Sequence, residues 1–387
     1  MHIVLCSTDY PPLVGGIARY SYHIAKNLAK EDIVKVLAVR MPHSNEFDRL
    51  QEFVTVRVPN VPIIREALLL RALLKIHRAE PIDWIINAVW FPCGLLSYCS
   101  HRIAGIKYVI AAHGSEILDD QRTWKRTLKG LFKAWKARMM ARASVVFPGS
   151  QYTKGRLLEA GVSTPMIVLN YGVDPEVFCP GPPSPLLMRQ LEIGPAECVL
   201  LSVGRLDLHK GHDVVIQALP RILKKIPSLV YIIVGDGPER KRLEQLVRHL
   251  GVASKLRMVG SVDDEHLAEY YRLCDIFILP NREIQGRLDL IEGFGIVFLE
   301  AGACEKPVIG GRSGGVSDAV LHGQTGLLVD PLSVEEVSDA VVRLCKNQAY
   351  AQELGQNGRK RCQRELNWVA VAGRLHKALE QLQTARR

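Results

Sequence analysis

Short apolar segments alternate with longer amphipathic segments along almost the whole chain, and this alternation constrains the fold more than any other feature. The apolar segments, which we predict to be strands, are 3–6, 34–39, 53–58, 84–89, 108–112, 145–148 and 166–170, then 198–203, 230–234, 256–259, 275–279, 307–310 and 327–329. Segments with helical periodicity between them include 17–30, 64–78, 123–142, 212–226, 238–250 and 264–273. The pattern predicts an α/β fold with parallel, doubly wound sheets.

The two series of strands are separated by a proline-rich stretch. Residues 172–195 contain six prolines, a density typical of a linker rather than of a helix or strand. A chain of 387 residues, 48% of them hydrophobic, can fill two cores of ordinary size. We therefore expect a first domain over 1–171, a linker over 172–195, a second domain over 196–366 and a terminal helix over 367–387.

The net charge and the spacing of the cysteines limit the classes to which the protein can belong. The formal net charge of +10 predicts an anionic partner: nucleic acid, a membrane surface or a phosphorylated substrate. Nucleic acid is the least favoured, because the sequence shows no RNP-type motif, basic low-complexity tail or helix-turn-helix pattern. Nine scattered cysteines without a CxxC pair predict reduced core thiols in a cytosolic protein, with neither disulfides nor zinc. We expect no signal peptide or membrane-spanning helix.

Two common nucleotide-binding fingerprints are absent from the sequence. Gly235-Asp-Gly237 lacks the third glycine of GxGxxG because position 240 is Arg, and no GxxxxGK[ST] segment occurs. A dehydrogenase or a P-loop ATPase is therefore disfavoured.

Two cations follow the predicted strand 198–203. Arg205 and Lys210 come at its carboxyl end, where open α/β sheets bind ligands. They can neutralise a diphosphate and stabilise the charge that grows as it leaves. The alternative is an exposed turn with two solvated cations.

A later segment, Glu292-Gly-Phe-Gly-Ile-Val-Phe-Leu-Glu300, carries two carboxylates around an apolar run. If a helix starts near Gly295, its free N–H groups and dipole attract a phosphate beside Glu292. Glu300 then lies about a turn and a half along, within reach of polar groups of the same ligand. This arrangement suits a sugar nucleotide. The alternative is two surface glutamates that flank a core helix.

The first half of the chain offers a second set of candidates. Gly15 and Gly16 come between the first predicted strand and a helix, where glycine lets the backbone approach an anion closely. A plain strand-to-helix turn is the alternative. His113 ends the predicted strand 108–112, and it is either a structural or a site residue. Asp9 and Tyr10 follow the first strand, where they can face an acceptor.

In order, spacing and content, these segments resemble the family-4 retaining glycosyltransferases of the GT-B fold. The resemblance runs from about residue 2 to about residue 380 and is densest between about 200 and 331. The matching motifs are Pro11–Arg19, Val203–Gly211, Ile233–Gly237, Val259–Val262, Glu292–Glu300, Pro307–Ile309, Gly314–Gly315 and Gly323–Pro331.

The resemblance implies two Rossmann-like domains that face a central cleft, with the terminal helix crossing back to the first domain. It implies that Arg205 and Lys210 hold the donor pyrophosphate, that Glu292 contacts the donor sugar and that Glu300 contacts the ribose. The remaining implied site residues are Phe294, Gly295 and Ile296, with backbone N–H groups for phosphate and sugar; Val262, bordering the base; Gly15 and Gly16, closing over the donor phosphate; and His113, near the transferred sugar.

The implied reaction transfers a hexose to a hydroxyl with retention of configuration, without a metal or other cofactor. Asp263-Asp264 are interpreted as helix-start residues rather than metal ligands. The segment 282–290 is similar to loops of bacterial phosphatidylinositol mannosyltransferases, which favours GDP-mannose over UDP-sugars and a lipid-linked or glycan acceptor. The alternatives are a GT-B sugar-nucleotide epimerase or hydrolase, and a non-catalytic module that binds an anionic lipid or glycan.

Residues 122–142 carry eight cations around an apolar face that includes Trp124 and Trp135. A basic amphipathic helix with tryptophans can lie on an anionic bilayer. The alternative is an ordinary helix with its apolar face on the sheet. The first interpretation predicts a cytoplasmic protein held peripherally at the inner face of the membrane.

Overall fold

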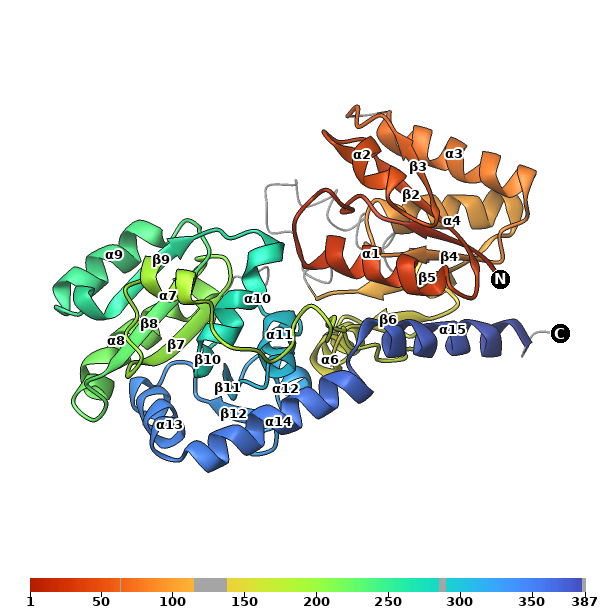
Figure 1. Ribbon diagram of the computed structural model, residues 1–387. Helices are drawn as coiled ribbons and strands as arrows, with labels where there is room; N and C mark the ends of the chain where they lie inside the picture. The colour runs from red at the N-terminus through yellow and green to blue at the C-terminus, as the bar shows by residue number, and fades with distance from the viewer. Residues whose placement is uncertain (63, 115–137, 285–289, 385–387) are drawn as a thin grey trace. The chain divides into compact units, whose positions relative to one another are not determined.

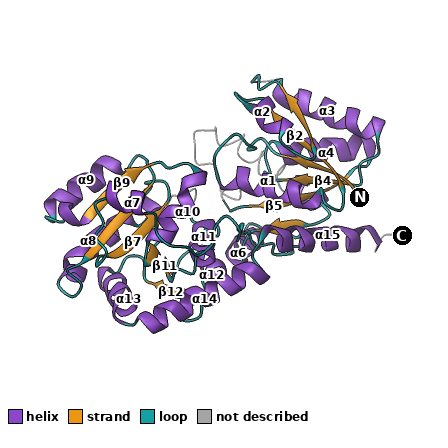
Figure 2. Ribbon diagram, in the orientation of Figure 1, coloured by secondary structure: helices purple, strands orange, loops and turns teal. Residues whose placement is uncertain are grey.

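The computed structural model describes residues 1–62, 64–114, 138–284 and 290–384. The chain divides into two compact units, one formed by Met1–Tyr171 with Trp368–Arg387 and the other by Gly172–Asn367. Each unit contains a six-stranded parallel sheet, and Figures 1 and 2 show the helices that pack around each sheet. No helix in the described ranges is both long and apolar enough to cross a bilayer.

In the first unit, the first strand of the chain lies in the middle of the sheet. The strand order is β3-β2-β1-β4-β5-β6, so β1 and β4 are adjacent at the centre and the chain fills one side before it returns to the other. The strands are β1 (His2–Cys6), β2 (Ile33–Val39), β3 (Val54–Val58), β4 (Trp84–Asn87), β5 (Lys107–Ala112) and β6 (Val146–Pro148). The helices are α1 (Gly16–Leu28), α2 (Ser44–Arg49), α3 (Arg65–Ala79), α4 (Cys93–Ala104), α6 (Gln151–Glu159) and α15 (Trp368–Thr384).

The second unit repeats this plan with the strand order β12-β11-β10-β7-β8-β9. The strands are β7 (Cys198–Val203), β8 (Leu229–Val234), β9 (Leu256–Gly260), β10 (Ile276–Leu279), β11 (Val308–Gly311) and β12 (Gly326–Val329). The helices are α7 (Pro185–Gln190), α8 (His212–Leu223), α9 (Arg240–His249), α10 (Asp264–Leu273), α11 (Ile296–Ala303), α12 (Val316–Ala319), α13 (Val334–Lys346) and α14 (Gln348–Arg364). Two short 3₁₀ turns, Leu208–Lys210 and Ala253–Lys255, complete the set.

The predicted α/β class is confirmed, because twelve of the thirteen predicted strands occur close to their expected positions and pair in parallel. These strands are short and most of their residues are apolar, as in other parallel sheets whose faces are covered by helices. The strand predicted over 166–170 is wrong. This segment forms a single bridge, from Met166 to Val146, because β6 is only three residues long and offers little edge to pair with.

The stretch 172–195 is not free of regular structure, contrary to the prediction. Helix α7 lies within it and begins at Pro185. Proline is tolerated at the first position of a helix because the N–H it lacks would have no intrahelical partner there. The Ser184 side chain caps the same turn by accepting a hydrogen bond from the Leu187 amide.

The segment Ser333-Val-Glu-Glu336 has the sequence of a capping box, but only one half of the box is formed at the start of α13. Ser333 Oγ accepts a hydrogen bond from the Glu336 amide at 3.1 Å. In a capping box the Glu336 carboxylate would accept from the amide of Ser333. Here it accepts from the Asp330 amide at 2.8 Å, so it stabilises the turn that precedes the helix.

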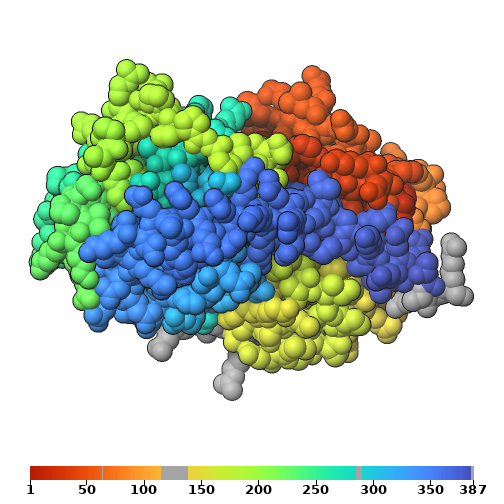
Figure 3. All heavy atoms as spheres, turned by 60° about the horizontal axis from the view of Figure 1, so that its bottom comes forward, coloured from red at the N-terminus to blue at the C-terminus, as the bar shows by residue number. Residues whose placement is uncertain are grey.

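Helix α15 packs against α1, so the end of the chain belongs to the first unit. Figure 3 shows its side chains, in dark blue, beside the red surface of the N-terminal residues. Trp368 at its start stacks on His23 of α1, with ring centroids 4.9 Å apart and an interplanar angle of 3°.

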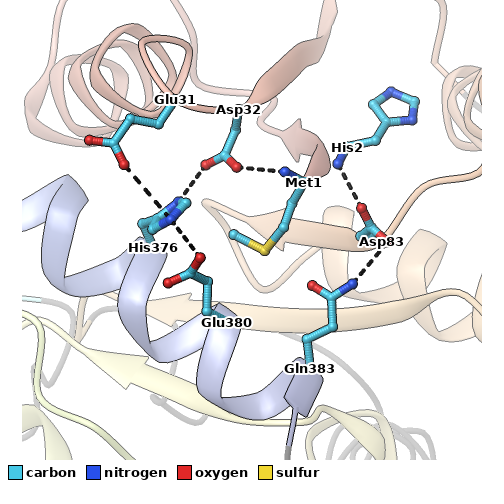
Figure 4. Close-up of polar contacts among 8 residues, drawn as sticks. All are labelled: Met1, His2, Glu31, Asp32, Asp83, His376, Glu380 and Gln383. Atoms are coloured by element: carbon cyan, nitrogen blue, oxygen red, sulfur yellow. Dashed lines mark hydrogen bonds and ion pairs between the residues drawn. The ribbon is translucent and has the colours of Figure 1, made fainter. Parts of the chain in front are cut away.

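A polar network fixes the far end of α15 to the same unit (Figure 4). The buried Asp32 carboxylate accepts from the Met1 amino group at 2.8 Å and from His376 Nδ1 at 2.7 Å. His376 also lies 3.3 Å from Glu380 and 3.8 Å from Glu31. Burial lowers the pKa of His376, but its hydrogen bond to Asp32 and the three carboxylates outweigh that effect and leave the pKa raised.

This network makes stability depend on pH. A histidine whose pKa is raised on folding stabilises the fold fully below its unfolded pKa of about 6.5, and the contribution is lost as pH rises through the folded value. His376→Gln should therefore lower stability by about 1 kcal/mol at pH 6, with a smaller effect at pH 9.

Thermal denaturation followed by circular dichroism at both pH values measures the effect. Lys377→Gln, on the exposed face of the same helix, is the control and should match the wild type. An equal loss at pH 6 and pH 9 would contradict a charged His376.

Candidate active site

The loops at the carboxyl edge of the second sheet define the site. Strands β7 and β10 are adjacent, and the chain leaves β7 towards β8 on one side and leaves β10 towards β11 on the other. Open α/β sheets bind ligands at this point, because loops that diverge from neighbouring strands leave a crevice between them. The loop after β7 carries Lys210, and the loop after β10 carries Glu292.

An ion pair joins these two loops. Lys210 Nζ lies 2.5 Å from Glu292 Oε2, and Asn281 Nδ2 donates to the same oxygen at 3.1 Å. Burial raises the pKa of the Glu292 carboxyl, but the charge and hydrogen bond of Lys210 outweigh it, so the pKa falls below its usual range. Glu292 is therefore a carboxylate at neutral pH, held in place by two donors.

Two glycines allow the loops to approach this closely. Gly211, with φ of 77°, follows Lys210, and a Cβ there would lie 2.1 Å from the carbonyl oxygen of Pro280. Gly314, with φ of 56°, follows β11, and a Cβ there would lie 2.4 Å from the carbonyl oxygen of Glu292. Side chains at either position would push apart the backbone segments that carry the ion pair.

A second, buried ion pair reinforces the same loops. Arg282 Nη2 donates to Asp213 Oδ2 at 2.8 Å, and the Arg282 amide donates to the carbonyl of His209 at 2.8 Å. Arg242 adds a contact of 3.2 Å to Asp213. Asp213 lies three residues beyond Lys210 and Arg282 lies next to Asn281. The pair therefore braces the two segments from which Lys210 and Asn281 reach Glu292.

Two buried histidines next to Lys210 contribute no positive charge at neutral pH. Burial and the nearby Lys210 lower the pKa of His209 and of His212 to about 4 each. The cationic character of the loop therefore comes from its lysine and arginine.

The two carboxylates predicted as site residues sit in different environments. Helix α11 begins after Gly295, as predicted, and Glu292 lies in the loop before it. Glu300, inside the helix, is only 1% exposed and accepts a hydrogen bond from the Tyr271 hydroxyl at 2.6 Å. Phe294 is also buried, whereas Ile296 at the first turn is half-buried. Neither glutamate is a freely solvated surface residue.

Arg205 and Lys210 lie in different environments. The Arg205 side chain is 70% exposed and lies 3.5 Å from Asp207, whereas Lys210 is largely enclosed by its ion pair. Val262 is half-buried after β9, at the same edge of the sheet but two strands from β7. Asp263 precedes the first residue of α10, so the predicted helix start is confirmed there.

The first unit has its own switch point between β1 and β4. Helix α1 begins at Gly16, and both Gly15 and Gly16 are exposed. A Cβ at either position would meet nothing within 4 Å among the described residues. Packing inside this unit therefore gives no reason for glycine at these positions.

His113 follows β5 directly and has both ring nitrogens engaged. Nε2 lies 2.6 Å from the carbonyl oxygen of Ala88, and Nδ1 contacts the Tyr171 hydroxyl. A carbonyl can only accept, so Nε2 carries a proton, whereas the Tyr171 hydroxyl can either donate to Nδ1 or accept from it. Tyr20 packs edge-on against the ring. The imidazole is thus fixed in one orientation.

Asp9 and Tyr10 lie in contrasting settings after β1. Asp9 is half-buried; burial raises the pKa of its carboxyl, and the nearby His113 partly offsets this. Tyr10 is 1% exposed and packs edge-on against Phe47, with Arg57 over its ring at 5.3 Å. The structure therefore places the Tyr10 side chain in the interior of the unit.

Several residues of the site were not anticipated. Asn281 and Arg282 are polar residues directly after an apolar strand, and that position alone was a usable signal. Asp213, Tyr171 and Tyr271 carry no such signal, because each acts through a partner that is distant in sequence.

Some predicted features lie outside the described residues. Residues 115–137 hold most of the basic segment, and residues 285–289 hold part of the polar loop after β10. At the described end of the basic segment, residues 138–142 are helical, Met139 is buried and Arg142 is exposed.

Comparisons with known proteins agree with the fold. The family described as "Glycosyltransferase Family 4" matches residues 14–177, and "Glycosyl transferases group 1" matches residues 184–361. A relative from Mycolicibacterium smegmatis, named GDP-mannose-dependent alpha-(1-6)-phosphatidylinositol monomannoside mannosyltransferase, is 30% identical over 99% of this chain and 100% of its own.

Two solved structures share the fold. Sucrose-phosphate synthase from Thermosynechococcus elongatus superposes with a TM-score of 0.78 at 23% identity and covers 99% of both chains. Anabaena HepE in complex with UDP gives a TM-score of 0.80 at 21% identity, covering 98% of this chain and 100% of its own.

The two six-stranded parallel sheets with their surrounding helices give this chain the GT-B fold. The chain belongs to glycosyltransferase family 4, whose members are retaining and use nucleotide-sugar donors.

Because the ion pair between Asp213 and Arg282 holds the two loops, we predict that its removal lowers activity even though it lies away from the donor. Asp213→Asn should lower turnover by about tenfold to a hundredfold, because a small displacement of Lys210 is costly when the reacting groups must be held precisely. It should also cost about 1–3 kcal/mol of stability, since Arg282 is left buried beside a neutral amide.

Steady-state kinetics and thermal denaturation measure both effects. Asp339→Asn removes a carboxylate from an exposed ion pair with Arg221 in the same unit, and it should leave both quantities unchanged. Normal turnover in a folded Asp213→Asn variant would exclude the brace as a positioning element.

Proposed function

We propose that the protein transfers mannose from GDP-mannose to a hydroxyl of a lipid-linked acceptor, with retention of configuration and without a metal. The observation that carries this proposal is the Lys210–Glu292–Asn281 cluster at the switch point between β7 and β10. It offers a fixed cation and an ionised carboxylate in adjacent positions, which is what a sugar diphosphate requires: charge for the phosphates and acceptors for the hydroxyls.

The donor diphosphate is held by charge and by backbone dipoles. Lys210 supplies a positioned cation, and the exposed Arg205 is free to swing from Asp207 towards the phosphates. The N-terminus of α11, with Gly295 and Ile296, directs backbone N–H groups at the same region. These groups stabilise the negative charge that develops as the glycosidic bond breaks.

The two glutamates bind different parts of the donor. Glu292, ionised and fixed by Lys210, accepts hydrogen bonds from sugar hydroxyls. Glu300, whose carboxylate is oriented by the Tyr271 hydroxyl, accepts a hydrogen bond from the ribose. Val262 borders the base.

The transfer proceeds by front-face attack. The acceptor oxygen bonds to the anomeric carbon on the side from which the diphosphate departs, and its proton passes to the leaving diphosphate oxygen. Both ring nitrogens of His113 contact other groups of the protein, Nε2 the Ala88 carbonyl and Nδ1 the Tyr171 hydroxyl, so it contributes position rather than a base in this arrangement.

We propose mannose and a lipid-linked acceptor because of the activities for which two relatives are named and because of the positive net charge of this chain. The M. smegmatis relative and a second from Corynebacterium glutamicum, 28% identical over 97% of this chain, are both named as GDP-mannose-dependent enzymes acting on phosphatidylinositol monomannosides. The net charge of +10 suits an acceptor at an anionic membrane.

A donor screen tests the proposal. GDP-mannose should raise the melting temperature and be turned over, whereas UDP-glucose and UDP-GlcNAc should have little effect. Hydrolysis without dependence on any acceptor would favour a hydrolase, and binding without turnover would favour a non-catalytic module. Preferred binding of a UDP-sugar would overturn the choice of donor.

Lys210→Ala should lower turnover by roughly tenfold to a thousandfold, the range for one lost contact to developing charge. Lys225→Ala, an exposed lysine on the same unit, is the matched control and should behave as the wild type. Kinetics on variants with native circular dichroism measure the effect. Full activity of the Lys210 variant would remove this residue from the site.

The glutamates should differ in the kind of defect they produce. Glu292→Gln should depress kcat, because its sugar contacts matter as the glycosidic bond breaks, whereas Glu300→Gln should mainly weaken nucleotide binding. Steady-state kinetics and calorimetric titration with GDP separate the two effects. Unchanged constants in both variants would contradict the assignment.

We also propose that the protein associates reversibly with anionic membranes through residues 122–142. Each cation near such a surface contributes about 1 kcal/mol, attenuated by salt. Binding to phosphatidylglycerol vesicles should therefore weaken steeply as salt rises, and neutral vesicles should bind poorly.

Co-sedimentation at low and high salt measures the membrane binding. Replacing Arg122, Lys125, Arg126 and Lys129 by Ser should reduce it and leave GDP affinity unchanged. If the wild type stays in the supernatant with anionic vesicles at low salt, a soluble acceptor becomes the better proposal.

A further inference from the structure

Two thiols of the second unit face each other at the edge of its sheet opposite to the donor site. Cys198 is the first residue of β7, and Cys345 is the last residue but one of α13. Their sulfur atoms lie 3.2 Å apart, although the residues are separated by 147 positions in the sequence. A disulfide requires a further approach of the sulfurs to about 2.0 Å, a movement within reach of small side-chain rotations.

We propose that Cys198 and Cys345 are a reversible oxidation site, at which a peroxide converts the two thiols into an intramolecular disulfide. The bond would join a central strand of the second sheet to helix α13, which packs on α8 and β12. This inference rests on the contact between the two sulfurs and does not depend on the donor or acceptor of the enzyme.

The exposure of these two residues distinguishes them from most other cysteines. Both are half-buried, so a molecule as small as hydrogen peroxide can reach them, whereas Cys6, Cys93, Cys274, Cys304 and Cys362 are buried. Cys274 is the nearest competitor to Cys198, but its thiol donates to the Tyr271 carbonyl at 3.4 Å.

The shared hydrogen bond makes the two sulfurs unequal. It lowers the pKa of Cys345, against the effect of burial, and together with burial it raises the pKa of Cys198. Either sulfur can donate in this contact, and the lowered pKa of Cys345 favours it as the sulfur that ionises first. A thiolate is the form of cysteine that attacks peroxide.

The reaction balances in two steps. The Cys345 thiolate attacks one peroxide oxygen, the O–O bond breaks, and Cys345 becomes a sulfenic acid while the hydroxide released takes up a proton. Cys198 then attacks the sulfenic sulfur, loses its own proton and displaces water. Overall, two thiols and one peroxide give one disulfide and two waters, and a thiol reductant reverses the change.

The position of the disulfide predicts how it affects thermal stability and GDP binding. Cys198 begins β7, whereas the Lys210 loop follows the other end of the same strand, so the bond leaves the donor loops in place. The disulfide would close a loop that contains most of the second unit, which restricts its unfolded state. The oxidised protein should melt about 5–10 °C higher than the reduced protein and should bind GDP with the same affinity.

The test is oxidation of the full chain with hydrogen peroxide, followed by alkylation and peptide mass spectrometry without reduction. Wild type and Cys99→Ser, a control at another half-buried cysteine, should yield one peptide pair that links Cys198 to Cys345 and is released by dithiothreitol. Cys198→Ser should instead accumulate a dimedone adduct at Cys345. Cys345→Ser should give neither the link nor an adduct at Cys198.

Three results would overturn the proposal. They are a wild-type protein that keeps all nine thiols at peroxide doses that oxidise a small-molecule thiol, a link that joins Cys198 to Cys274 instead, and covalent dimers in place of the intramolecular bond. Because no step of this test uses a sugar donor, its failure is separate from failure of the proposed function.

Discussion

Each unit starts its sheet with a central strand, and the rest of the structure depends on this arrangement. After β1 and again after β7, the chain fills one side of the sheet and then returns to the other. Connections between parallel strands run in one hand, so the loops that leave the two central strands diverge. At this edge of the sheet Lys210 meets Glu292 in one unit, and Asp9 and His113 come within electrostatic reach in the other.

The ion pair between Lys210 and Glu292 is stable because each charge compensates the desolvation of the other, and Asn281 satisfies a further lone pair. A partly buried pair of this kind contributes less net stability than an apolar pair of the same size, but removal of one partner is costly. The Lys210–Glu292 ion pair is therefore better explained by the binding of a charged ligand than by a contribution to the stability of the fold. The second pair, between Arg282 and Asp213, has the structural task of holding the loops.

The two edges of the second sheet have different roles. Charged and polar side chains gather at the carboxyl edge, whereas the amino edge brings together Cys198 and Cys345. A central strand links the two edges through a continuous ladder of hydrogen bonds to β8 and β10. The Cys198–Cys345 contact and the loop that carries Lys210 therefore lie at opposite ends of this strand.

The sequence by itself determined the class of fold, the positions of nearly all strands, the start of α11 and the order of the loops, because these follow from local periodicity and from the motifs. Segment 166–170 and helix α7 escaped prediction, since the first depended on the length of a neighbouring strand and the second on a proline at a permitted position. Only the tertiary structure decided that Lys210 pairs with Glu292 while Arg205 faces solvent, that Tyr10 is buried, and that Cys198 meets Cys345. These contacts join residues far apart in the chain, and the packing of the strands and helices between them sets their distances.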